Sequence, residues 1–395
     1  MIKLLSLFSG IGAFESALHR GGYDFTLVNY CEIDKYASKA YSQIHEVSED
    51  LNLRDVTKVD TAKLPKDLDL ITYGFPCTDI SIAGRKKGFF NENGNPTRSG
   101  LFYDALKIIR DLQPKYAIAE NVKNLTGKKF KEEFKSVLDG LTDAGYNNYW
   151  QVLNAKDYGI PQNRERIFII SIRKDIDTGT FTFPKKQPLQ LRLKDLLQQE
   201  VEEKYYIKKA VNTRIADNYI QYDNSGKGYN SQSERLYYQD GLCPTIPTSN
   251  NNGDKTQIIL MDKETVIQHA ADWTKNKQVD MNSYINEIIS KNIETPVGID
   301  EQNVKVRTDG LVGTIMTNGS SAKKNNRICC TDFRIRKLTP RECFRLMGFT
   351  DEEFDRIHNI SNTQLYKQAG NSIVVNVLTA IFNELFNQNS VFQLE

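Results

Sequence analysis

Short apolar runs alternate with segments of helical periodicity through the first 172 residues, and this alternation limits the folds that the chain can adopt. The runs have the length and the β-branched and aromatic content of strands, and they are residues 2–8, 26–31, 68–73, 115–119, 149–153 and 167–172. Apolar residues recur at helical spacing in residues 13–20, 101–111 and 130–145. Because crossovers between parallel strands are right-handed, this order predicts an α/β fold with a doubly wound sheet.

A turn with two glycines, Phe8-Ser9-Gly10-Ile11-Gly12, separates the first strand from the first helix. The glycines let the backbone approach a ligand at the helix N-terminus, and a plain tight turn is the alternative. The third glycine of the dinucleotide fingerprint is missing, because Glu15 follows Phe14. A pyrophosphate is therefore not the favoured ligand, and a nicotinamide oxidoreductase fits the chain poorly.

Two acidic residues follow at positions that suit a nucleoside. Glu32 ends the second strand, about 20 residues beyond the glycine turn, which is the spacing at which a carboxylate meets ribose hydroxyls. Asp55 follows another short connection and could accept a hydrogen bond from an adenine amine. The alternatives are a solvated charge before the next helix for Glu32, and a surface acid or helix cap for Asp55.

Cys77 follows the strand at residues 68–73, which Gly74 and Pro76 end sharply. The thiol should therefore stand at the carboxyl end of a strand, where open α/β sheets bind ligands. Rigid backbone would hold a nucleophile there, since Pro76 limits how the turn can relax. The alternative is a buried cysteine that acts as a small hydrophobic residue.

The next strand delivers Glu120 to the same edge of the predicted sheet. Desolvation at an apolar strand end should raise the pKa of this carboxyl, which suits proton donation or sharing with a ring nitrogen. Pairing of Glu120 with Lys123 is the alternative. Arg164 and Arg166 stand two apart on an extended segment and should point the same way, as a clamp for a carbonyl or phosphate or as two surface ion pairs.

Long polar segments interrupt the pattern twice. Residues 78–100 are basic and glycine-rich, which is typical of a binding loop that closes over a ligand. After Pro184 the alternation stops, and residues 185–335 predict a second, smaller, loop-rich domain. Two similar segments around Thr245 and Thr314 could face the two sides of one groove, or could be chance turns. The densest basic cluster includes Lys323 and Lys324, a footprint expected for phosphate binding.

The last part of the chain returns to helix. Thr339, Pro340 and Glu342 are in the order expected for a helix N-cap, first position and first turn. Residues 368–372 are expected to open an apolar helix at 373–386 that packs against the first domain.

Composition limits the class of protein. The formal net charge of +2 is too small to indicate nucleic-acid binding by the whole surface, so any basic surface must be local. The six cysteines include no CxxC pair, which argues against a metal site or a disulfide framework and for a reducing compartment. Since no signal peptide or long apolar span is visible, we expect a soluble, cytoplasmic protein that does not contact membranes.

Taken in order, these motifs resemble those of the DNA cytosine-5 methyltransferase family of bacteria and phages, of the restriction-modification type. The matching segments are Phe8-Ser9-Gly10-Ile11-Gly12, Glu32, Asp55, Pro76-Cys77, Glu120-Asn121-Val122, Gln162-Asn163-Arg164-Glu165-Arg166, Leu338-Thr339-Pro340-Arg341-Glu342 and Gly370-Asn371-Ser372. The resemblance implies a mixed, doubly wound sheet of the S-adenosylmethionine-dependent methyltransferase type. It also implies a catalytic and cofactor-binding domain at 1–184, a target-recognition domain at 185–335, and a segment at 336–395 that completes the first domain.

The resemblance further implies methyl transfer from S-adenosylmethionine to carbon 5 of a specific cytosine in duplex DNA, after the base is flipped out. Cys77 would add to carbon 6, Glu120 would hold or protonate ring nitrogen 3, and Arg166, with Arg164 nearby, would bind the carbonyl at position 2. The residues matching the family's cofactor pocket are Phe8, Gly10, Gly12, Glu32, Asp55 and Asn371. The candidates for DNA contacts are Ser81, Arg85, Thr314, Lys323 and Lys324.

One departure from the family is Thr78, which stands where glutamine commonly follows the Pro-Cys pair. Two alternative functions are methylation of RNA cytosine and DNA binding without catalysis. We expect a monomer that acts on double-stranded DNA, with any cognate restriction endonuclease acting separately.

Overall fold

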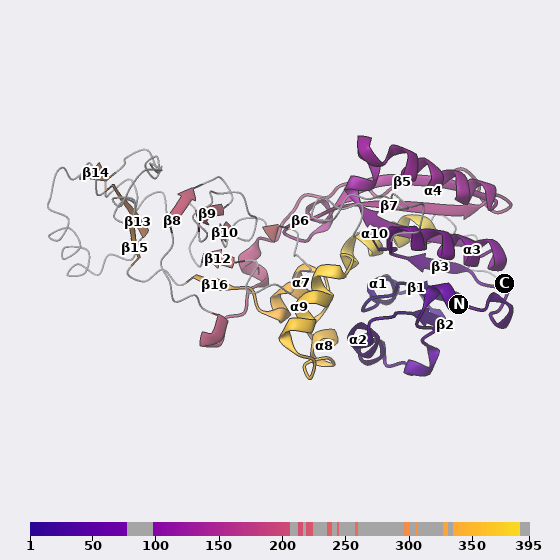
Figure 1. The fold of residues 1–395 in the computed structure, drawn as a ribbon, viewed down its shortest axis with the longest axis horizontal. Helices are drawn as coiled ribbons and strands as arrows, with labels where there is room; N and C mark the ends of the chain where they lie inside the picture. Colours follow the sequence, from indigo (N-terminus) through magenta and orange to yellow (C-terminus); the bar gives the residue numbers. More distant parts are fainter. Residues whose placement is uncertain are drawn as a thin grey trace. The chain divides into compact units, whose positions relative to one another are not determined.

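The computed structural model describes residues 1–76, 98–205 and 338–387, together with the backbone of short strands between residues 212 and 337 (Figure 1). The predicted site residues that lie outside this description are Cys77, Ser81, Arg85, Thr314, Lys323 and Lys324. The chain divides into two compact units, one of residues 1–189 and 344–395 and one of residues 190–343. Each unit is described by itself.

The first unit is built on a six-stranded sheet. Its strands are β1 (Ile2–Leu7), β2 (Phe25–Cys31), β3 (Leu70–Tyr73), β4 (Tyr116–Val122), β5 (Tyr146–Asn154) and β7 (Glu165–Arg173), in the spatial order β2-β1-β3-β4-β7-β5. The first four are parallel, whereas β7 runs antiparallel to both β4 and β5. The chain order reverses between β1 and β3, which is the point where such sheets bind ligands. The predicted α/β class is confirmed.

Helices cover both faces of this sheet. The helices that lie wholly within this unit are α1 (Ala13–Arg20), α2 (Lys35–His45), α3 (Phe102–Leu112), α4 (Lys131–Asp143), α8 (Asp351–Asp355), α9 (Asn362–Asn371) and α10 (Val375–Asn387). Leu5, Ile71 and Ala117 share a core cluster with residues of α3 and α4. Successive strand residues point to opposite faces, so Tyr116, the neighbour of Ala117, faces the other side of the sheet. Its ring lies 5.7 Å from that of Phe386 in α10. There α10 packs beside α1 (Figure 1).

The second unit contains two small sheets of short strands. One has the order β16-β12-β10-β9-β8, with β8 at Asn212–Ile215, β9 at Tyr219–Asp223, β10 at Arg235–Tyr238, β12 at Gln257–Ile259 and β16 at Ile335–Lys337. The other pairs β13 (Pro296–Asp300) with β14 (Lys305–Val306) and β15 (Arg327–Cys330).

The predicted helix start near residue 339 is confirmed. Helix α7 (Pro340–Leu346) begins at the proline. The Thr339 hydroxyl accepts a hydrogen bond from the Glu342 N–H at 3.2 Å, and the Glu342 carboxylate accepts one from the Thr339 N–H at 2.8 Å. This reciprocal pair satisfies two backbone donors at the helix start.

The boundaries of two other elements differ from the prediction. Residues 368–372 do not open the last helix, because Gln368 to Asn371 form the end of α9 and α10 begins at Val375. Strand β4 continues to Val122, since its pairing with β7 extends to Arg166. Glu120 therefore lies within the strand rather than after it.

One described stretch, Asn362–Phe386, is long and apolar enough by length and composition to cross a membrane. Within its most apolar window, 61% is buried inside the structure. Burial of that extent is typical of the core helix of a globular unit, so the stretch is weak evidence for a membrane span.

Candidate active site

Five segments meet at one edge of the six-stranded sheet. The carboxyl ends of β1, β2, β3 and β4 lie there because these strands are parallel. The antiparallel strand β7 begins at the same edge, where Arg166 pairs with Val122. Glu32, Gly74, Glu120 and Arg166 therefore lie along this one edge, where the sequence predicts a ligand site.

Glu120 and Arg166 form an ion pair at this edge. Arg166 Nε lies 3.1 Å from Glu120 Oε1, and the two side chains are 17% and 13% exposed. Burial raises the pKa of Glu120, although the guanidinium groups of Arg166 and Arg164 act in the opposite direction. A carboxyl with a raised pKa beside a fixed cation can hold a proton or share one with a ligand.

Lys123 does not pair with Glu120. Its ammonium lies 2.9 Å from both carboxylate oxygens of Glu165, at the start of β7. This pair is about half exposed, so it contributes little to stability. The alternative interpretation of Glu120 as the partner of Lys123 is therefore wrong.

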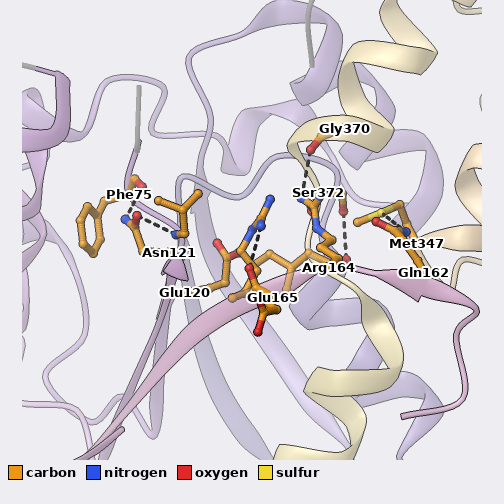
Figure 2. A network of polar contacts seen from close by, with 12 residues as sticks. Phe75, Glu120, Asn121, Gln162, Arg164, Glu165, Met347, Gly370 and Ser372 are labelled. Carbon is orange, nitrogen blue, oxygen red and sulfur yellow. Dashed lines mark hydrogen bonds and ion pairs between the residues drawn. The ribbon is translucent and has the colours of Figure 1, made fainter. Parts of the chain in front are cut away.

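The chain that leads to Cys77 is tied to β4. The Asn121 side chain donates a hydrogen bond to the Phe75 carbonyl at 3.0 Å and accepts one from the Val122 N–H at 2.8 Å (Figure 2). Gly74 lies against Glu120, since a Cβ on it would be 3.7 Å from Glu120 Oε2. These contacts hold the backbone just before Cys77 beside Glu120. The sequence motif contains Asn121, but its partner on another strand could not be read from it.

Arg164 points away from the Glu120 pair and toward the C-terminal segment. Its Nη2 donates to the carbonyls of Gly370 and Ser372, at 3.0 and 2.7 Å (Figure 2). The two arginines were expected to point the same way, but Arg164 lies between β6 (Gln162–Asn163) and β7 rather than inside one strand. Alternation along a strand therefore does not apply to it. Arg164 instead joins this edge to the turn between α9 and α10.

The glycine turn has the backbone geometry that the two glycines suggest. Phe8, Gly10 and Gly12 all have positive φ values, of 52°, 58° and 81°. A Cβ on Gly12 would lie 1.9 Å from His45 Nε2, so glycine is required there for conformation and for space. The Nε2 atom of the partly buried His45 ring is also 3.1 Å from the Ile11 carbonyl oxygen, so the ring braces the turn from α2.

The Glu32 carboxylate binds one backbone N–H of this turn. Its carboxylate accepts hydrogen bonds from the Gly10 N–H at 2.9 Å and the Asp34 N–H at 2.7 Å. Burial raises the pKa of Glu32, and these two N–H groups oppose the rise. Because a protein carboxylate already binds the glycine turn, a second anion such as pyrophosphate is disfavoured there. A nucleoside without a phosphate at that position suits the site better.

The residues around Glu32 fit the adenosine part of S-adenosylmethionine. A carboxylate oxygen has several lone pairs, so Glu32 can accept from ribose hydroxyls while it holds the turn. The side chain of Ile33, which the sequence interpretation missed, is 75% exposed directly beside it. The exposed Ile33 side chain beside the Glu32 carboxylate could contact the apolar face of a ligand's ring. In the sequence, the feature that could have identified Ile33 is its position directly after Glu32, the acid at the end of the second strand.

The other two predicted cofactor residues differ in their surroundings. Asp55 accepts hydrogen bonds from the Thr57 N–H and hydroxyl at 3.1 and 2.8 Å, and it caps a short 3₁₀ helix. These bonds lower its pKa. One carboxylate oxygen of Asp55 therefore caps a helix, which was the alternative role considered for this residue. Asn371 is exposed at the end of α9, between the two carbonyls that bind Arg164.

Among the residues whose side chains the structure describes there are two other cysteines, and both are buried. Burial raises the pKa of Cys31 to about 12, and its thiol is 3.2 Å from the Arg54 carbonyl. Cys343 is also buried. A thiol with so high a pKa has almost no thiolate at neutral pH, so Cys31 is an unsuitable nucleophile.

The chain is similar to known proteins along nearly its whole length. A family model described as C-5 cytosine-specific DNA methylase matches residues 2–387. The orphan methyltransferase M.SPRI of Bacillus phage SPR is 36% identical, over 98% of each chain. The type II methyltransferase M2.ScrFI of Lactococcus lactis subsp. cremoris is 37% identical, over 85% of this chain and 71% of that protein. The fold is similar to the crystal structure of the S. pombe Dnmt2 methyltransferase, with a TM-score of 0.60 and 17% identity over 98% of this chain and 99% of that one.

Proposed function

This chain belongs to the C-5 cytosine-specific DNA methylase family and is a DNA cytosine-5-methyltransferase, and we propose that it methylates a specific cytosine through a covalent bond to Cys77. One observation carries the proposal: the largely buried Glu120–Arg166 pair lies beside Gly74, and the neighbouring Asn121 binds the Phe75 carbonyl, so both contacts are to the chain that leads to Cys77. A carboxyl that can hold a proton and a fixed cation beside the backbone that leads to Cys77 support the proposed role of the thiol.

The proposed chemistry overcomes the low nucleophilicity of carbon 5 of cytosine. The Cys77 thiolate forms a bond to carbon 6. The electron pair of the carbon 5–carbon 6 double bond is then shared between carbon 5 and ring nitrogen 3. Glu120 gives or shares its proton at ring nitrogen 3, so negative charge does not accumulate there. S-adenosylmethionine, when bound, would supply the methyl group that carbon 5 accepts; its methyl–sulfur bond would break and S-adenosylhomocysteine would leave. A base then removes the proton from carbon 5, and the thiolate leaves as the double bond forms again.

The two arginines take different proposed roles. Arg166 binds the carbonyl at position 2 of the base, and its ion pair keeps Glu120 in place. Arg164 is a positioning residue, since its guanidinium binds two backbone carbonyls on either side of Asn371. It therefore couples the catalytic edge to a residue of the proposed cofactor pocket.

The proposed cofactor pocket combines the glycine turn with three polar residues. Phe8 stacks on adenine, Gly10 and Gly12 allow the close backbone approach, and Glu32 binds the ribose. Asp55 and Asn371 complete the polar part of the pocket. Glu32 supports this proposal most directly, because it already joins the turn to the end of β2.

The target cytosine must leave the DNA stack to reach Cys77, because a stacked base hides carbon 6. We propose that residues 78–100 close over the flipped base, with Ser81 and Arg85 contacting DNA. Residues 185–335 act as the target-recognition domain, with Thr314, Lys323 and Lys324 at the DNA, and 1–184 and 336–395 form the catalytic domain. The enzyme is proposed to be cytoplasmic, to act as a monomer and to work separately from any restriction endonuclease.

Covalent trapping tests the proposal. Duplex DNA that carries 5-fluorocytosine blocks the last proton removal, so wild-type enzyme with S-adenosylmethionine should accumulate an adduct at Cys77, mapped by mass spectrometry of peptides. Cys77→Ser should form no adduct, while the buried-cysteine control Cys343→Ser should still form it. Absence of an adduct from wild-type enzyme that methylates the unmodified DNA would disprove the covalent route.

A second measurement tests the substrate class. Bisulfite sequencing of DNA from cells that express the protein should show one methylated sequence context. A tritiated-methyl assay with duplex DNA and transfer RNA in competition should label the DNA. Labelling of transfer RNA instead would support the RNA alternative, and labelling of neither would support a DNA-binding protein without catalysis.

A further inference from the structure

The side chain of Asn52 joins two segments of the proposed cofactor pocket. Asn52 is only 9% exposed, and it stands shortly before Asp55 in the sequence. Its backbone forms an isolated parallel bridge with Tyr30, near the end of β2, and the Leu53 N–H donates to the Tyr30 carbonyl at 2.7 Å. The segment that leads to Asp55 therefore lies along the end of the strand that leads to Glu32.

The Asn52 amide binds the backbone of Glu32 twice. Its Nδ2 donates to the Glu32 carbonyl at 2.9 Å, and its Oδ1 accepts from the Glu32 N–H at 3.0 Å. Because Glu32 follows the last residue of β2, this amide takes the place that a neighbouring strand would have. The Glu32 carboxylate is held separately, by the N–H groups of Gly10 and Asp34. The backbone and the side chain of Glu32 are thus both fixed.

The same amide holds the turn before Asp55. Asn52 Oδ1 also accepts a hydrogen bond from the Arg54 N–H at 2.8 Å, which closes an Asx turn. Arg54 has a φ of 63°, a left-handed conformation that is uncommon for a residue with a side chain and persists where neighbouring contacts hold it. Asn52 therefore helps to determine how the chain enters Asp55.

The hydrogen-bonding capacity of the Asn52 amide is fully used. Its Nδ2 donates a second bond, at 2.8 Å, to the hydroxyl of the buried Ser38 in α2. An amide has two N–H donors and two acceptor lone pairs, and each of them has a partner here. Such a buried network can serve stability alone. However, all of its bonds except the one to Ser38 end on Glu32 or on Arg54, the residue before Asp55.

We infer that Asn52 is a positioning residue for S-adenosylmethionine, because it holds Glu32 and Asp55 in a fixed relation to each other. The inference rests on the proposed function, which assigns Glu32 to the ribose and Asp55 to the polar part of the pocket. Acids that are already oriented lose little freedom when a ligand binds, so the entropic cost of binding is smaller. Asn52 acts through these two residues and does not touch the cofactor itself.

A matched pair of asparagines tests the inference. Asn29 of β2 donates a hydrogen bond to the Leu51 carbonyl at 3.0 Å, so it joins the same two segments through a different carbonyl. Asn52→Ala should raise the Kd of S-adenosylhomocysteine, measured by calorimetric titration of the full chain, by about tenfold, and Asn29→Ala by less than about twofold. Both variants should unfold at a lower urea concentration, so stability alone does not separate the two roles.

The kinetics should show the same division. In Asn52→Ala the KM for S-adenosylmethionine should rise, while the single-turnover rate at saturating cofactor stays within about threefold of wild type. If the alanine variant does not fold, Asn52→Asp replaces it, since aspartate keeps both acceptor contacts and loses both donors. Its Kd for S-adenosylhomocysteine should rise by at least about threefold.

A second ligand separates positioning from a general loosening of the fold. The analogue of S-adenosylhomocysteine without the ribose 2′-hydroxyl lacks a contact proposed for Glu32, so wild-type protein should bind it about tenfold more weakly than the parent compound. In Asn52→Ala this ratio should fall toward one, because Glu32 is no longer held in place. An unchanged ratio, an unchanged Kd in Asn52→Ala or an equal rise in Asn29→Ala overturns the inference. Wild-type protein that binds neither ligand, or both equally, would instead overturn the proposed role of Glu32, and the inference with it.

Discussion

Glu120 and Arg166 form a largely buried ion pair across two antiparallel strands, with Arg166 Nε 3.1 Å from Glu120 Oε1. Val122, two residues beyond Glu120 on β4, pairs with Arg166 on β7. Both side chains therefore project from rigid strands rather than loops. Burial raises the pKa of Glu120 in spite of its cationic partner. The pair thus combines a fixed positive charge with a carboxyl that can retain a proton.

We expect Glu120→Gln to slow methyl transfer on the order of 10²–10⁴-fold, the usual contribution of a general acid or base. Glutamine keeps the size and a hydrogen-bond donor but cannot transfer a proton. Single-turnover rates with saturating DNA measure the effect. The control is Glu165→Gln, which removes the exposed partner of Lys123 and should change the rate less than threefold. A Glu120→Gln rate within threefold of wild type would show that Glu120 is not the proton donor.

The glycine turn offers a matched pair of substitutions. Gly10 and Gly12 both have positive φ, but a Cβ on Gly10 meets nothing within 4 Å, whereas one on Gly12 meets His45. Gly10→Ala should cost about 1–2 kcal/mol of unfolding free energy from conformation alone. Gly12→Ala should cost about 1–3 kcal/mol more from overpacking, and should also weaken binding of S-adenosylmethionine. Urea unfolding and calorimetric titration measure the two effects.

The double variant Gly12→Ala/His45→Ala tests the cause of the larger loss. If the clash with the His45 ring is responsible, truncation of the ring should recover part of the free energy of unfolding lost in Gly12→Ala. The coupling follows from a double-mutant cycle. Additive losses would assign the effect to backbone conformation instead.

The sequence predicts best what depends on neighbouring residues. The strands before the glycine turn and before Gly74 follow from apolar runs, and their parallel order then brings Glu32 and Glu120 to one edge. The cap formed by Thr339 and Glu342 is equally local, since three residues separate the partners. In each case the residues that determine the local structure lie within about one helical turn or one strand of the motif.

Contacts between distant residues were not predictable in the same way. Arg164 binds carbonyls 206 and 208 residues away, and the pattern of alternation suggested the wrong direction for its side chain. The ion pair of Lys123 with Glu165 needs the register of β4 and β7. These features depend on which strands become neighbours, and periodicity contains no information about that.

Arg164→Lys should destabilise the first unit and weaken cofactor binding together. A lysine cannot match the planar group that contacts the Gly370 and Ser372 carbonyls, so at least one buried acceptor loses its partner. Loss of a charged buried hydrogen bond costs about 1.5–3 kcal/mol. Urea unfolding should show this, and the Kd for S-adenosylmethionine should rise because Asn371 lies between the two carbonyls. The exposed control Arg110→Lys should change neither, and equal effects of the two variants would contradict the role of Arg164.

A buried acid beneath the glycine turn makes stability depend on pH. Glu15 of α1 is buried, and it accepts a hydrogen bond from the Tyr41 hydroxyl at 2.8 Å. Burial raises its pKa, so the folded protein holds this proton at pH values where the unfolded chain has lost it. The stabilisation is complete below the unfolded pKa of about 4.3, and is lost as pH rises through the higher folded pKa.

Glu15→Gln should remove this dependence, because the amide is neutral at every pH and similar in shape. The free energy of unfolding of the variant minus that of the wild type should therefore rise with pH above about 4.3, by at most about 1.4 kcal/mol per pH unit, and level off above the folded pKa. Urea unfolding at half-unit steps from pH 4 to 8 measures the difference. Glu132→Gln, which changes an exposed acid in the first turn of α4, is measured in the same way for comparison. Parallel curves for wild type and Glu15→Gln would mean that Glu15 ionises in the folded protein as readily as in the unfolded chain.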